Sequence, residues 1–540
     1  MFYTRPTDLF IIINNNEQLT SISMPISTLI SEFNIYKYRQ GGMLWPHKEI
    51  TWTAGPLDAK VLRKFPRLRK LDCSGNSLES LDGIEVCSML LKLVCSFNSL
   101  VSLAGIEHLP KLEKLKCSHN QLTSMLEVQS CPHLRKLSCA SNKLTQLEGI
   151  ETCSNLIKLN CSHNPLAHLG KITDCIHLQH LRCSQIELTS IEGIGKCRQL
   201  TKLQVSCNPL TSLAGISECK QLVDLDCSSN MLTSIAGVEQ CPLLERLDCM
   251  NNQLETMTGI EGCTQLRKLN CAFNKLVSIE EIRRDERACD RRTDDTESVT
   301  TLEGVRGCSK LDTLCCALNQ VTSIQAVECC PLLKHFDCSR NQLSNLNGIE
   351  ACLQLKHLDA AGNQLVTLTE ARSCQQLRSL SCWGNQLTSL AELEYFPLLE
   401  NLNCFNSQLV SLTGVENCTQ LRTLRCGGNH IETFREIRNC PHLRSLSCTG
   451  SKLKTIDGIE ACPQLEYFEC SNNQLTTLQG IESCPKLLQL DCSTNRLTSL
   501  DNLLHLEQLE KLVYVNNPID PPSYELKLFL KKLHCLTTFD

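Results

Sequence analysis

A leucine returns every 22 residues along most of this chain, and that period constrains the fold more than any other feature. The first copy opens at Leu68 and the register holds through Leu266. After one insertion it resumes at Leu311 and continues to Leu509, so that about twenty copies fill residues 68–517. A fixed period of this size predicts a solenoid, in which each unit packs only on its neighbours. Such a stack offers a long repetitive surface and no natural active-site cleft.

Each copy has the pattern of a short strand followed by a turn and a return segment. Leu71 and Cys73 lie two residues apart, so they share the buried face of a strand, and the residues beside them face solvent. Asn76 ends the strand, and in a stack its side chain can bond backbone groups of its own and neighbouring turns. Seventeen of the twenty copies keep this asparagine. Gly83 permits a tight backbone in the return segment, which passes around the core through Leu78, Leu81, Ile84 and Cys87.

The chain contains 38 cysteines, and their positions follow the repeat. Seventeen occupy the position of Cys73 and sixteen the position of Cys87. Where this pattern lapses, apolar residues such as Val205 and Ala360 take the place of cysteine, which indicates that the thiols act as small core hydrophobes. We therefore expect reduced, buried cysteines and a cytoplasmic or other reducing intracellular location. Five cysteines fall outside the two positions, and Cys315 is the candidate for a reactive thiol: Cys207, Cys289, Cys315, Cys329 and Cys535.

The repeat resembles the leucine-rich repeat, written in this chain as Leu-x-x-Leu-x-Cys-Ser-x-Asn-x-Leu. Its tail, Leu-x-Gly-Ile-Glu in residues 147–151, resembles the 22-residue subclass that includes bacterial internalins and a regulatory subunit of protein phosphatase one. The resemblance implies an α/β leucine-rich-repeat solenoid: a curved right-handed stack with parallel strands on its concave face and extended or 3-10 segments on its convex side. The density of cysteine also resembles leucine-rich-repeat proteins encoded by large DNA viruses of amoebae.

The period divides the chain into three parts and one insertion. We expect residues 1–67 to form an N-terminal segment and cap, because Phe65-Pro-Arg-Leu68 imitates the joint between repeats. Residues 518–540 resemble the C-terminal cap of the subclass, with an amphipathic helix from about Ser523. The charged insertion near 280–301 has almost nothing to bury, which predicts a mobile loop that is either a tether for a partner or a tolerated insertion.

Several function classes lack support in the sequence. A net charge of −5 and a pI of about 6.3 argue against a globally basic nucleic-acid binder. The chain has no 18-residue apolar run and no secretory signal. Phosphate-binding Gly-rich loops, zinc-protease motifs and nucleophile elbows are missing, and the histidines are scattered. We therefore predict no enzymatic activity, no cofactor and no metal site, and we expect a monomer or one subunit of a larger assembly without membrane attachment.

The outward positions of the predicted strands supply the candidate binding residues. The position before the strand leucine is Lys or Arg in eight of the first ten repeats and neutral in most of the others, where acidic residues lie nearby. The position after the strand cysteine is small almost throughout, but two successive repeats place large aromatic residues there. Aromatics on a polar surface are typical of binding hot spots, although the two rings could instead pack on each other. The predicted partner-binding residues are Lys92, Lys114, Lys136, Lys158, Lys202, Trp383, Phe405, Arg425 and Tyr467.

These observations favour a non-catalytic scaffold that binds a partner protein on its concave face, and the lysine stripe would suit an acidic partner. Such a stripe could also follow a phosphate backbone, or it could simply keep the surface solvated. The alternatives are therefore a nucleic-acid-binding solenoid, which the weakly acidic composition disfavours, and a structural component of a viral particle. A phosphatase-type regulatory subunit is a further version of the scaffold, implied by the resemblance alone.

Overall fold

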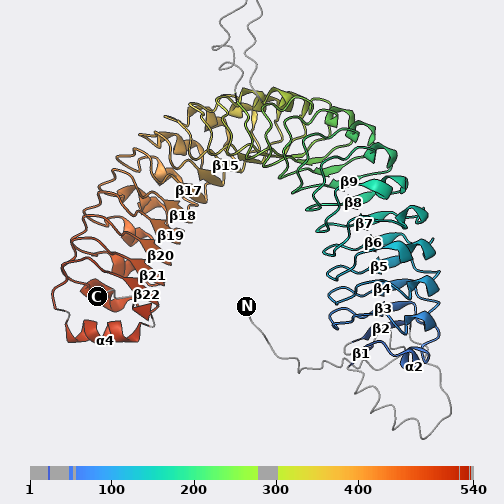
Figure 1. Ribbon diagram of the computed structural model, residues 1–540. Coiled ribbons are helices and arrows are strands. Elements are labelled where there is room, and N and C mark those ends of the chain that lie inside the picture. The colour runs from blue at the N-terminus through green and yellow to red at the C-terminus, as the bar shows by residue number, and fades with distance from the viewer. Residues whose placement is uncertain are drawn as a thin grey trace, which may run out of the picture. The chain divides into compact units, whose positions relative to one another are not determined.

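A computed structural model describes residues 22–24, 48–52, 56–277, 302–521, 523–533 and 535–536. The chain divides into two compact units, residues 1–244 and residues 245–540, which are described separately below. Each unit is a stack of short parallel strands joined by return segments that contain 3-10 turns. Figure 1 shows the strands on one side of each stack and the 3-10 turns on the other. The expected α/β leucine-rich-repeat solenoid is confirmed.

The described part of unit 1 contains ten parallel strands, each paired in register with the next one along the chain. From β3 onward every strand is three residues long and the strands recur at the 22-residue period, which gives one strand per repeat. The strands are β1 Ile22–Met24, β2 Glu49–Trp52, β3 Lys70–Asp72, β4 Lys92–Val94, β5 Lys114–Lys116, β6 Lys136–Ser138, β7 Lys158–Asn160, β8 His180–Arg182, β9 Lys202–Gln204 and β10 Asp224–Asp226.

Unit 2 repeats this arrangement, and its described strands also pair in register and in chain order. β12 pairs directly with β13 across the insertion, so the stack continues where the sequence period is interrupted. The strands are β11 Arg246–Asp248, β12 Lys268–Asn270, β13 Thr313–Cys315, β14 His335–Asp337, β15 His357–Asp359, β16 Ser379–Ser381, β17 Asn401–Asn403, β18 Thr423–Arg425, β19 Ser445–Ser447, β20 Tyr467–Glu469, β21 Gln489–Asp491, β22 Lys511–Val513 and β23 Cys535–Leu536.

The return segments contain 3-10 turns whose start explains the Gly-Ile-Glu tail of the repeat. Gly83 has φ +100°, a conformation that suits glycine, and its N–H donates to Glu85 Oε2 at 2.8 Å. The glutamate therefore caps the turn that the glycine opens. In unit 1 the turns are η1 Ile84–Val86, η2 Ile106–His108, η3 Leu126–Ser130, η4 Ile150–Thr152, η5 Gly170–Asp174, η6 Ile194–Lys196, η7 Ile216–Glu218 and η8 Val238–Gln240. In unit 2 they are η9 Glu303–Gly307, η10 Gln325–Cys329, η11 Ile349–Ala351, η12 Thr369–Ser373, η13 Ala391–Tyr395, η14 Val415–Asn417, η15 Arg435–Asn439, η16 Ile459–Ala461, η17 Ile481–Ser483 and η18 Asp501–His505.

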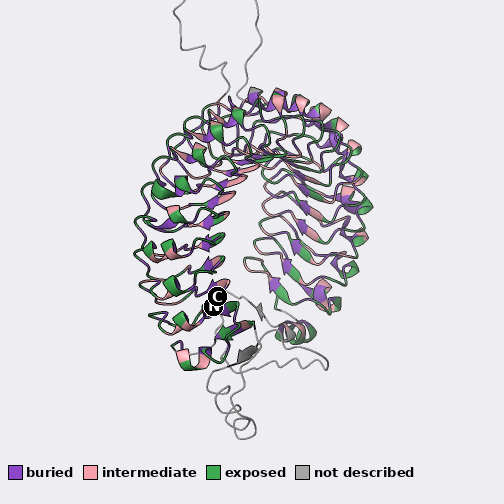
Figure 2. Ribbon diagram, turned by 90° about the vertical axis from the view of Figure 1, so that its right-hand side faces the viewer, coloured by how far each residue is buried: buried purple, intermediate pink, exposed green. Residues whose placement is uncertain are grey.

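The core of each unit consists of columns of leucine, isoleucine and cysteine that repeat from turn to turn (Figure 2). All cysteines at the positions of Cys73 and Cys87 are buried, as expected. Their thiols are also placed to donate to carbonyls of neighbouring repeats: Cys73 Sγ lies 3.4 Å from Val94 O, and Cys153 Sγ lies 3.6 Å from Val128 O. The thiol therefore serves both as a small apolar group and as a weak donor to the backbone.

The asparagine that ends each strand links successive repeats through both ends of its amide. Asn98 Nδ2 donates to Cys73 O of the previous repeat and to Cys95 O of its own repeat, each at 3.0 Å. Its Oδ1 accepts from the backbone N–H groups of Asn76 and Leu78 in the previous repeat, at 2.9 and 3.0 Å. We call the column of these side chains the asparagine ladder. It satisfies backbone groups that a turn would otherwise leave unpaired.

The residue just before each ladder position has a left-handed backbone in all twenty repeats, with φ between +51° and +71°. Five of these residues are glycine, and the others include residues as large as Phe97, Phe273 and Leu318. The sequence pattern did not predict this conformation, because it places no preferred residue type at this position. The tight turn after each strand imposes it.

Short elements lie at the N-terminal end of unit 1 and at the C-terminal end of unit 2. At the N-terminal end, β2 pairs with β3, the side chain of Trp52 is buried, and α2 (Ala59–Leu62) begins at Asp58, whose carboxylate accepts the N–H of Lys60. At the C-terminal end, α4 (Tyr524–Lys532) follows the N-cap Ser523 and buries Leu526 and Leu530. The rest of the expected N-terminal cap and the insertion at 280–301 lie outside the described residues.

Candidate partner-binding surfaces

A strip of cationic side chains follows the outward face of unit 1. Lys92, Lys114, Lys136 and Lys158 occupy the same position in β4 to β7 and are direct partners in the strand register. The structure adds two residues that the sequence reasoning missed, Lys116 on β5 and Arg182 on β8, which lie two positions further along their strands. A second outward column read from the sequence would have found them. We call these six residues the lysine strip.

The centre of the lysine strip is a hollow of about 320 Å³. Five of the six strip residues line it together with neutral side chains, and no carboxylate is among its lining residues. Within the described part of unit 1 no member of the strip forms a salt bridge; the nearest intact pairs are Lys70–Glu49 and Lys202–Asp224 at the two ends. The hollow is lined by Lys114, Leu115, Lys116, Lys136, Leu137, Ser138, Lys158, Leu159, Asn160, His180 and Arg182.

Lys202 is therefore set apart from the other predicted lysines. Its Nζ lies 2.5 Å from Asp224 Oδ2, and both side chains are mostly shielded from solvent. His180 on β8 separates it from Lys158 in the same column. Because its charge is already paired, Lys202 has less attraction left for a ligand than Lys136 or Lys158.

Burial and the crowding of positive charge together lower the pKa of two side chains along the strip. Partial burial, followed by the charges of Lys116, Lys92 and Lys136, lowers the pKa of Lys114. Burial, followed by the charges of Lys158 and Lys202, lowers the pKa of His180. In both cases like charges held at strand spacing, about 4.8 Å, add to the effect of burial, and only at His180 does an acid, Asp224, oppose them.

The two predicted aromatic residues of unit 2 lie at the ends of neighbouring strands but contact different groups. The Trp383 ring lies under the guanidinium of Arg340, whose Cζ is 5.3 Å from the ring centroid. The Phe405 ring lies against the next repeat, where a Cβ added to Gly427 would be 3.2 Å from Phe405 Cδ2. Among the described residues, Trp383 and Phe405 do not stack on each other. The structure therefore does not support the alternative in which the two rings pack together. We call Trp383 and Phe405 the aromatic patch.

The remaining predicted residues lie further along unit 2. Arg425 is exposed on β18, the strand after that of Phe405. Tyr467, 40% exposed, lies on β20, three strands from β17 and on a different outward column. By strand spacing this is about 14 Å from the aromatic patch. Tyr467 therefore does not extend the patch directly, whereas Arg425 borders it.

The acidic residues expected near the second half form two pairs, one on β14 and β15 and one, Glu469 with Asp491, on β20 and β21. Asp337 and Asp359 are register partners, and burial raises the pKa of Asp359. Cys315 is half-buried and its Sγ lies 3.4 Å from Asp337 Oδ2. Burial, reinforced by the Asp337 carboxylate, raises the pKa of the Cys315 thiol to about 12. The prediction of a reactive thiol at Cys315 is therefore wrong, because a nucleophilic cysteine needs a lowered pKa.

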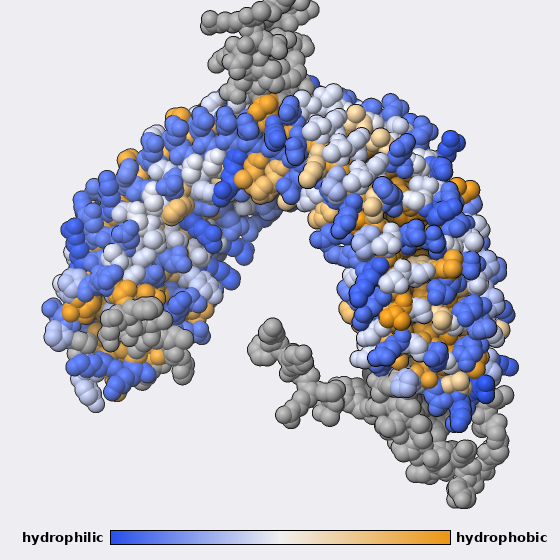
Figure 3. All heavy atoms as spheres, in the orientation of Figure 1, coloured by the Kyte–Doolittle hydropathy of each residue, from blue (hydrophilic) through white to orange (hydrophobic). Residues whose placement is uncertain are grey.

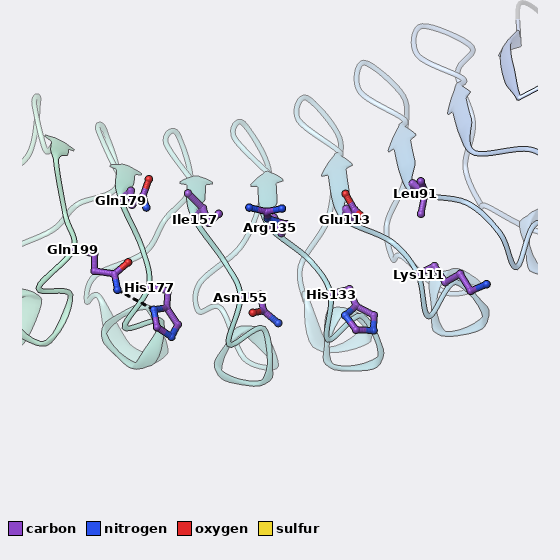
Figure 4. Close-up of a pocket in the computed structure, with 10 residues that line it drawn as sticks. All are labelled: Leu91, Lys111, Glu113, His133, Arg135, Asn155, Ile157, His177, Gln179 and Gln199. Carbon is purple, nitrogen blue, oxygen red and sulfur yellow. Dashed lines mark hydrogen bonds between the residues drawn. The ribbon is translucent and has the colours of Figure 1, made fainter.

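A second hollow, about 670 Å³, lies along one edge of unit 1 and has two rows of lining residues (Figure 4). One row precedes the strands and mixes apolar with charged side chains; the other consists of polar and basic residues. His177 Nδ1 and Gln199 Nε2 lie 3.1 Å apart within it. Figure 3 shows the same mixture of hydrophilic and apolar residues on the visible side of unit 1. The rows are Leu91, Glu113, Arg135, Ile157 and Gln179, and Lys111, His133, Asn155, His177 and Gln199.

Neither ladder of cysteines has the properties of a chemical site. Burial raises the pKa of Cys183 to about 12, and that of Cys153 to about 11. Among the described residues there is no group of three or more His, Cys, Asp or Glu side chains that could hold a metal ion. No helix of the described chain is long and apolar enough to cross a bilayer.

Comparisons with known proteins agree with this architecture. A family model described as leucine rich repeats in two copies matches residues 419–461 and 463–505. The functional domain of InlJ from Listeria monocytogenes, whose structure is described as including a cysteine ladder, is 27% identical over 72% of this chain and 75% of its own, with a TM-score of 0.53. No curated protein matches the sequence significantly.

Two further solved structures share the fold at lower identity. YopM from Yersinia enterocolitica is 21% identical, and the match covers 92% of this chain and 97% of that one with a TM-score of 0.66. The Arabidopsis receptor kinase HAESA, solved with the peptide hormone IDA and the co-receptor SERK1, is 20% identical over 89% of this chain and 84% of its own, with a TM-score of 0.62. The 22-residue subclass and a viral source remain predictions. With the repeat geometry described above, these likenesses show that the chain has the leucine-rich-repeat fold.

Proposed function

We propose that this protein is a non-catalytic scaffold that binds a partner protein on the outward faces of its strands. The observation that carries the proposal is the lysine strip: side chains that add nothing to the core, repel one another and have no acidic partner within the described unit 1. Unpaired like charges in register are unfavourable for the isolated sheet. A partner that supplies the missing negative charge removes that cost.

The absence of a candidate for catalysis in the described residues supports a binding role. Neither hollow combines a carboxylate with a hydroxyl or thiol nucleophile: the larger is lined by Glu113 and two histidines, and the smaller has Ser138 and His180 without a carboxylate. Leucine-rich-repeat proteins are typically interaction domains, and the HAESA structure is that of a relative in fold bound to a peptide and a co-receptor. Fold alone does not assign function, so the argument depends on the strip and the patch themselves.

A protein partner fits the lysine strip better than a single-stranded nucleic acid does. Proteins that bind single strands combine basic grooves with aromatic rings on which bases stack. The outward strand positions of β4 to β9 provide one ring, the imidazole of His180, and the exposed Phe97 after β4 is already stacked on His119 with ring centroids 4.3 Å apart. The aromatic patch belongs to unit 2 and offers a separate contact surface, where Trp383 presents a half-exposed indole and Phe405 is 42% exposed.

The test is affinity capture of the partner protein, with the full-length chain or its matched variants as bait. The double variant Lys114→Gln, Lys136→Gln should weaken capture most strongly at low salt, because rim charges act mainly on the association rate. The double variant Trp383→Ala, Phe405→Ala should cost on the order of 2 kcal/mol per ring if these rings are hot spots.

The controls change exposed residues away from these faces. Lys171→Gln with Lys220→Gln removes the same two charges from unit 1, and Leu353→Ala with Val410→Ala removes apolar groups that are 60% and 65% exposed in unit 2. Capture that survives both test variants with the fold intact by circular dichroism would reject the strand faces as the binding surface.

A further inference from the structure

We propose that the hollow in the lysine strip is a binding site for a segment that carries several phosphoryl groups on neighbouring side chains, such as a multiply phosphorylated peptide. This inference rests on the proposed scaffold function and specifies the chemistry of the partner at that surface. It begins from the charge of the hollow, whose lining holds five of the six cations of the strip. These are Lys114, Lys116, Lys136, Lys158 and Arg182.

The cations lie on four consecutive strands, β5 to β8, which pair in register. Three strand intervals of about 4.8 Å span about 14 Å. An extended peptide places side chains of one face about 6.7 Å apart, so about three of them fit over the hollow. A helical segment, with neighbours at i and i+4 about 6 Å apart, fits a similar number.

Counting charge decides between carboxylates and phosphates. Three carboxylates supply three negative charges, which leaves part of the hollow uncompensated. Three phosphoryl groups supply about 4.5 to 6, because each carries about −1.5 to −2 at neutral pH. The five cations therefore match the phosphorylated segment more closely. Phosphate oxygens also accept several charge-assisted hydrogen bonds at once, and Arg182 can bind one of them in bidentate fashion.

The neutral residues of the hollow suit the same ligand. Ser138 and Asn160 are half-buried in the second outward column, between Lys116 and Arg182, and offer hydroxyl and amide donors to oxygen atoms that the cations do not reach. Burial and then the neighbouring lysine charges lower the pKa of Lys114, and dianionic groups placed between the columns would relieve the repulsion among those charges. In contrast, the pair Lys202–Asp224 closes the strip at β9 and β10 with an internal carboxylate.

The experiment measures binding of three synthetic heptapeptides to the full-length protein by fluorescence polarisation. The peptides place phosphoserine, glutamate or serine at three alternate positions. We expect the phosphoserine peptide to bind at least about tenfold more tightly than the glutamate peptide, and the serine peptide not to bind. The double variant Lys114→Gln, Lys136→Gln should bind the phosphoserine peptide at least about tenfold more weakly. The affinity of the unchanged protein for this peptide should fall steeply as the salt concentration rises.

The control variant Lys171→Gln, Lys220→Gln has the same net charge as the test variant. Its affinity for the phosphoserine peptide should lie within about twofold of that of the unchanged protein. Equal binding of the phosphoserine and glutamate peptides would overturn the inference and leave an acidic partner, so the proposed function would stand. Equal losses in test and control variants would overturn it as well, since attraction would then come from net charge. Tighter binding of single-stranded RNA, dependent on the same two lysines, would replace the phosphopeptide with a nucleic acid.

Discussion

At the scale of single residues, the turn after each strand is the most demanding position of the repeat. All twenty repeats hold a left-handed residue there, and fifteen of these residues have a side chain. An L-residue in this region costs roughly 1 kcal/mol, which glycine avoids. The stack tolerates the cost because the surrounding strands and the asparagine ladder leave the turn no alternative path.

Replacing Ser141 with glycine should therefore stabilise the protein. Ser141 has φ +55°, and the hydrogen bonds at this turn involve its backbone, so that they survive the change. We expect a gain of about 0.5 kcal/mol in the free energy of unfolding, measured by urea denaturation. The reverse change, Gly384→Ala at φ +66°, should destabilise by about 1 kcal/mol. A loss of stability in Ser141→Gly would contradict the argument.

Two repeats replace the ladder asparagine with serine, and in both the hydroxyl is buried without a hydrogen-bond partner among the described residues. Ser451 is one of them. In the next repeat, Asn473 holds the same ladder position, and its Nδ2 donates to two strand carbonyls. The amide in Ser451→Asn would reach the equivalent carbonyls one repeat earlier. We expect Ser451→Asn to raise the free energy of unfolding by about 1–2 kcal/mol. Ser451→Ala is the matched control, and an asparagine variant no more stable than the alanine variant would reject the proposed bonds.

At the scale of the repeating element, the asparagine ladder is the polar counterpart of the apolar core. Each amide joins two turns, so its loss affects two repeats rather than one. The ladder becomes most buried in the middle of unit 1, where Asn164 is 2% exposed. Unit 1 tolerates one apolar substitute, Ile186, whose side chain is buried and whose N–H still donates to Asn208 Oδ1 at 3.0 Å.

Asn164→Ala should destabilise unit 1 by about 2–3 kcal/mol, because it leaves buried backbone groups unpaired. Its Nδ2 donates to Cys139 O and Cys161 O at 3.1 and 2.9 Å, and its Oδ1 accepts from Leu144 N at 3.1 Å. Thermal unfolding followed by circular dichroism would measure the effect. Asn155→Ala, on an exposed edge of unit 1, is the control and should change stability by less than about 0.5 kcal/mol. Equal effects of the two changes would show that the ladder bonds contribute nothing.

At the scale of the whole molecule, the two cysteine ladders tie stability to pH. Burial raises the pKa of these thiols to about 11 or 12, or further, while a thiol in an unfolded chain titrates near 8.5. Below about pH 8.5 both states keep the proton, so the ladders leave stability independent of pH. Above it the unfolded chain releases protons that the folded chain retains, and the free energy of unfolding falls as pH rises.

We therefore expect the protein to unfold cooperatively in mildly alkaline solution. Each ladder thiol contributes up to about 1.4 kcal/mol per pH unit, and many act together. Circular dichroism and the ultraviolet absorbance of thiolate should change at the same pH, above about pH 9, when measured under reducing conditions without oxygen. Thiolate absorbance that rises gradually near pH 8.5 while the fold persists would contradict the burial of the ladders.

The sequence by itself determined the period, the strand positions, the two buried cysteine columns and the outward placement of Lys114, Lys136, Trp383 and Phe405. Those features depend on local alternation and on a hydrophobic pattern repeated many times, so any one repeat reports on the others. The tertiary structure decided which outward charges remain unpaired, as the contrast between Lys136 and Lys202 shows. It also turned Trp383 toward Arg340 and Phe405 toward Gly427, and it raised the pKa of Cys315. These outcomes depend on residues 20 or more positions away in the chain, whose sizes and charges meet only when the repeats stack.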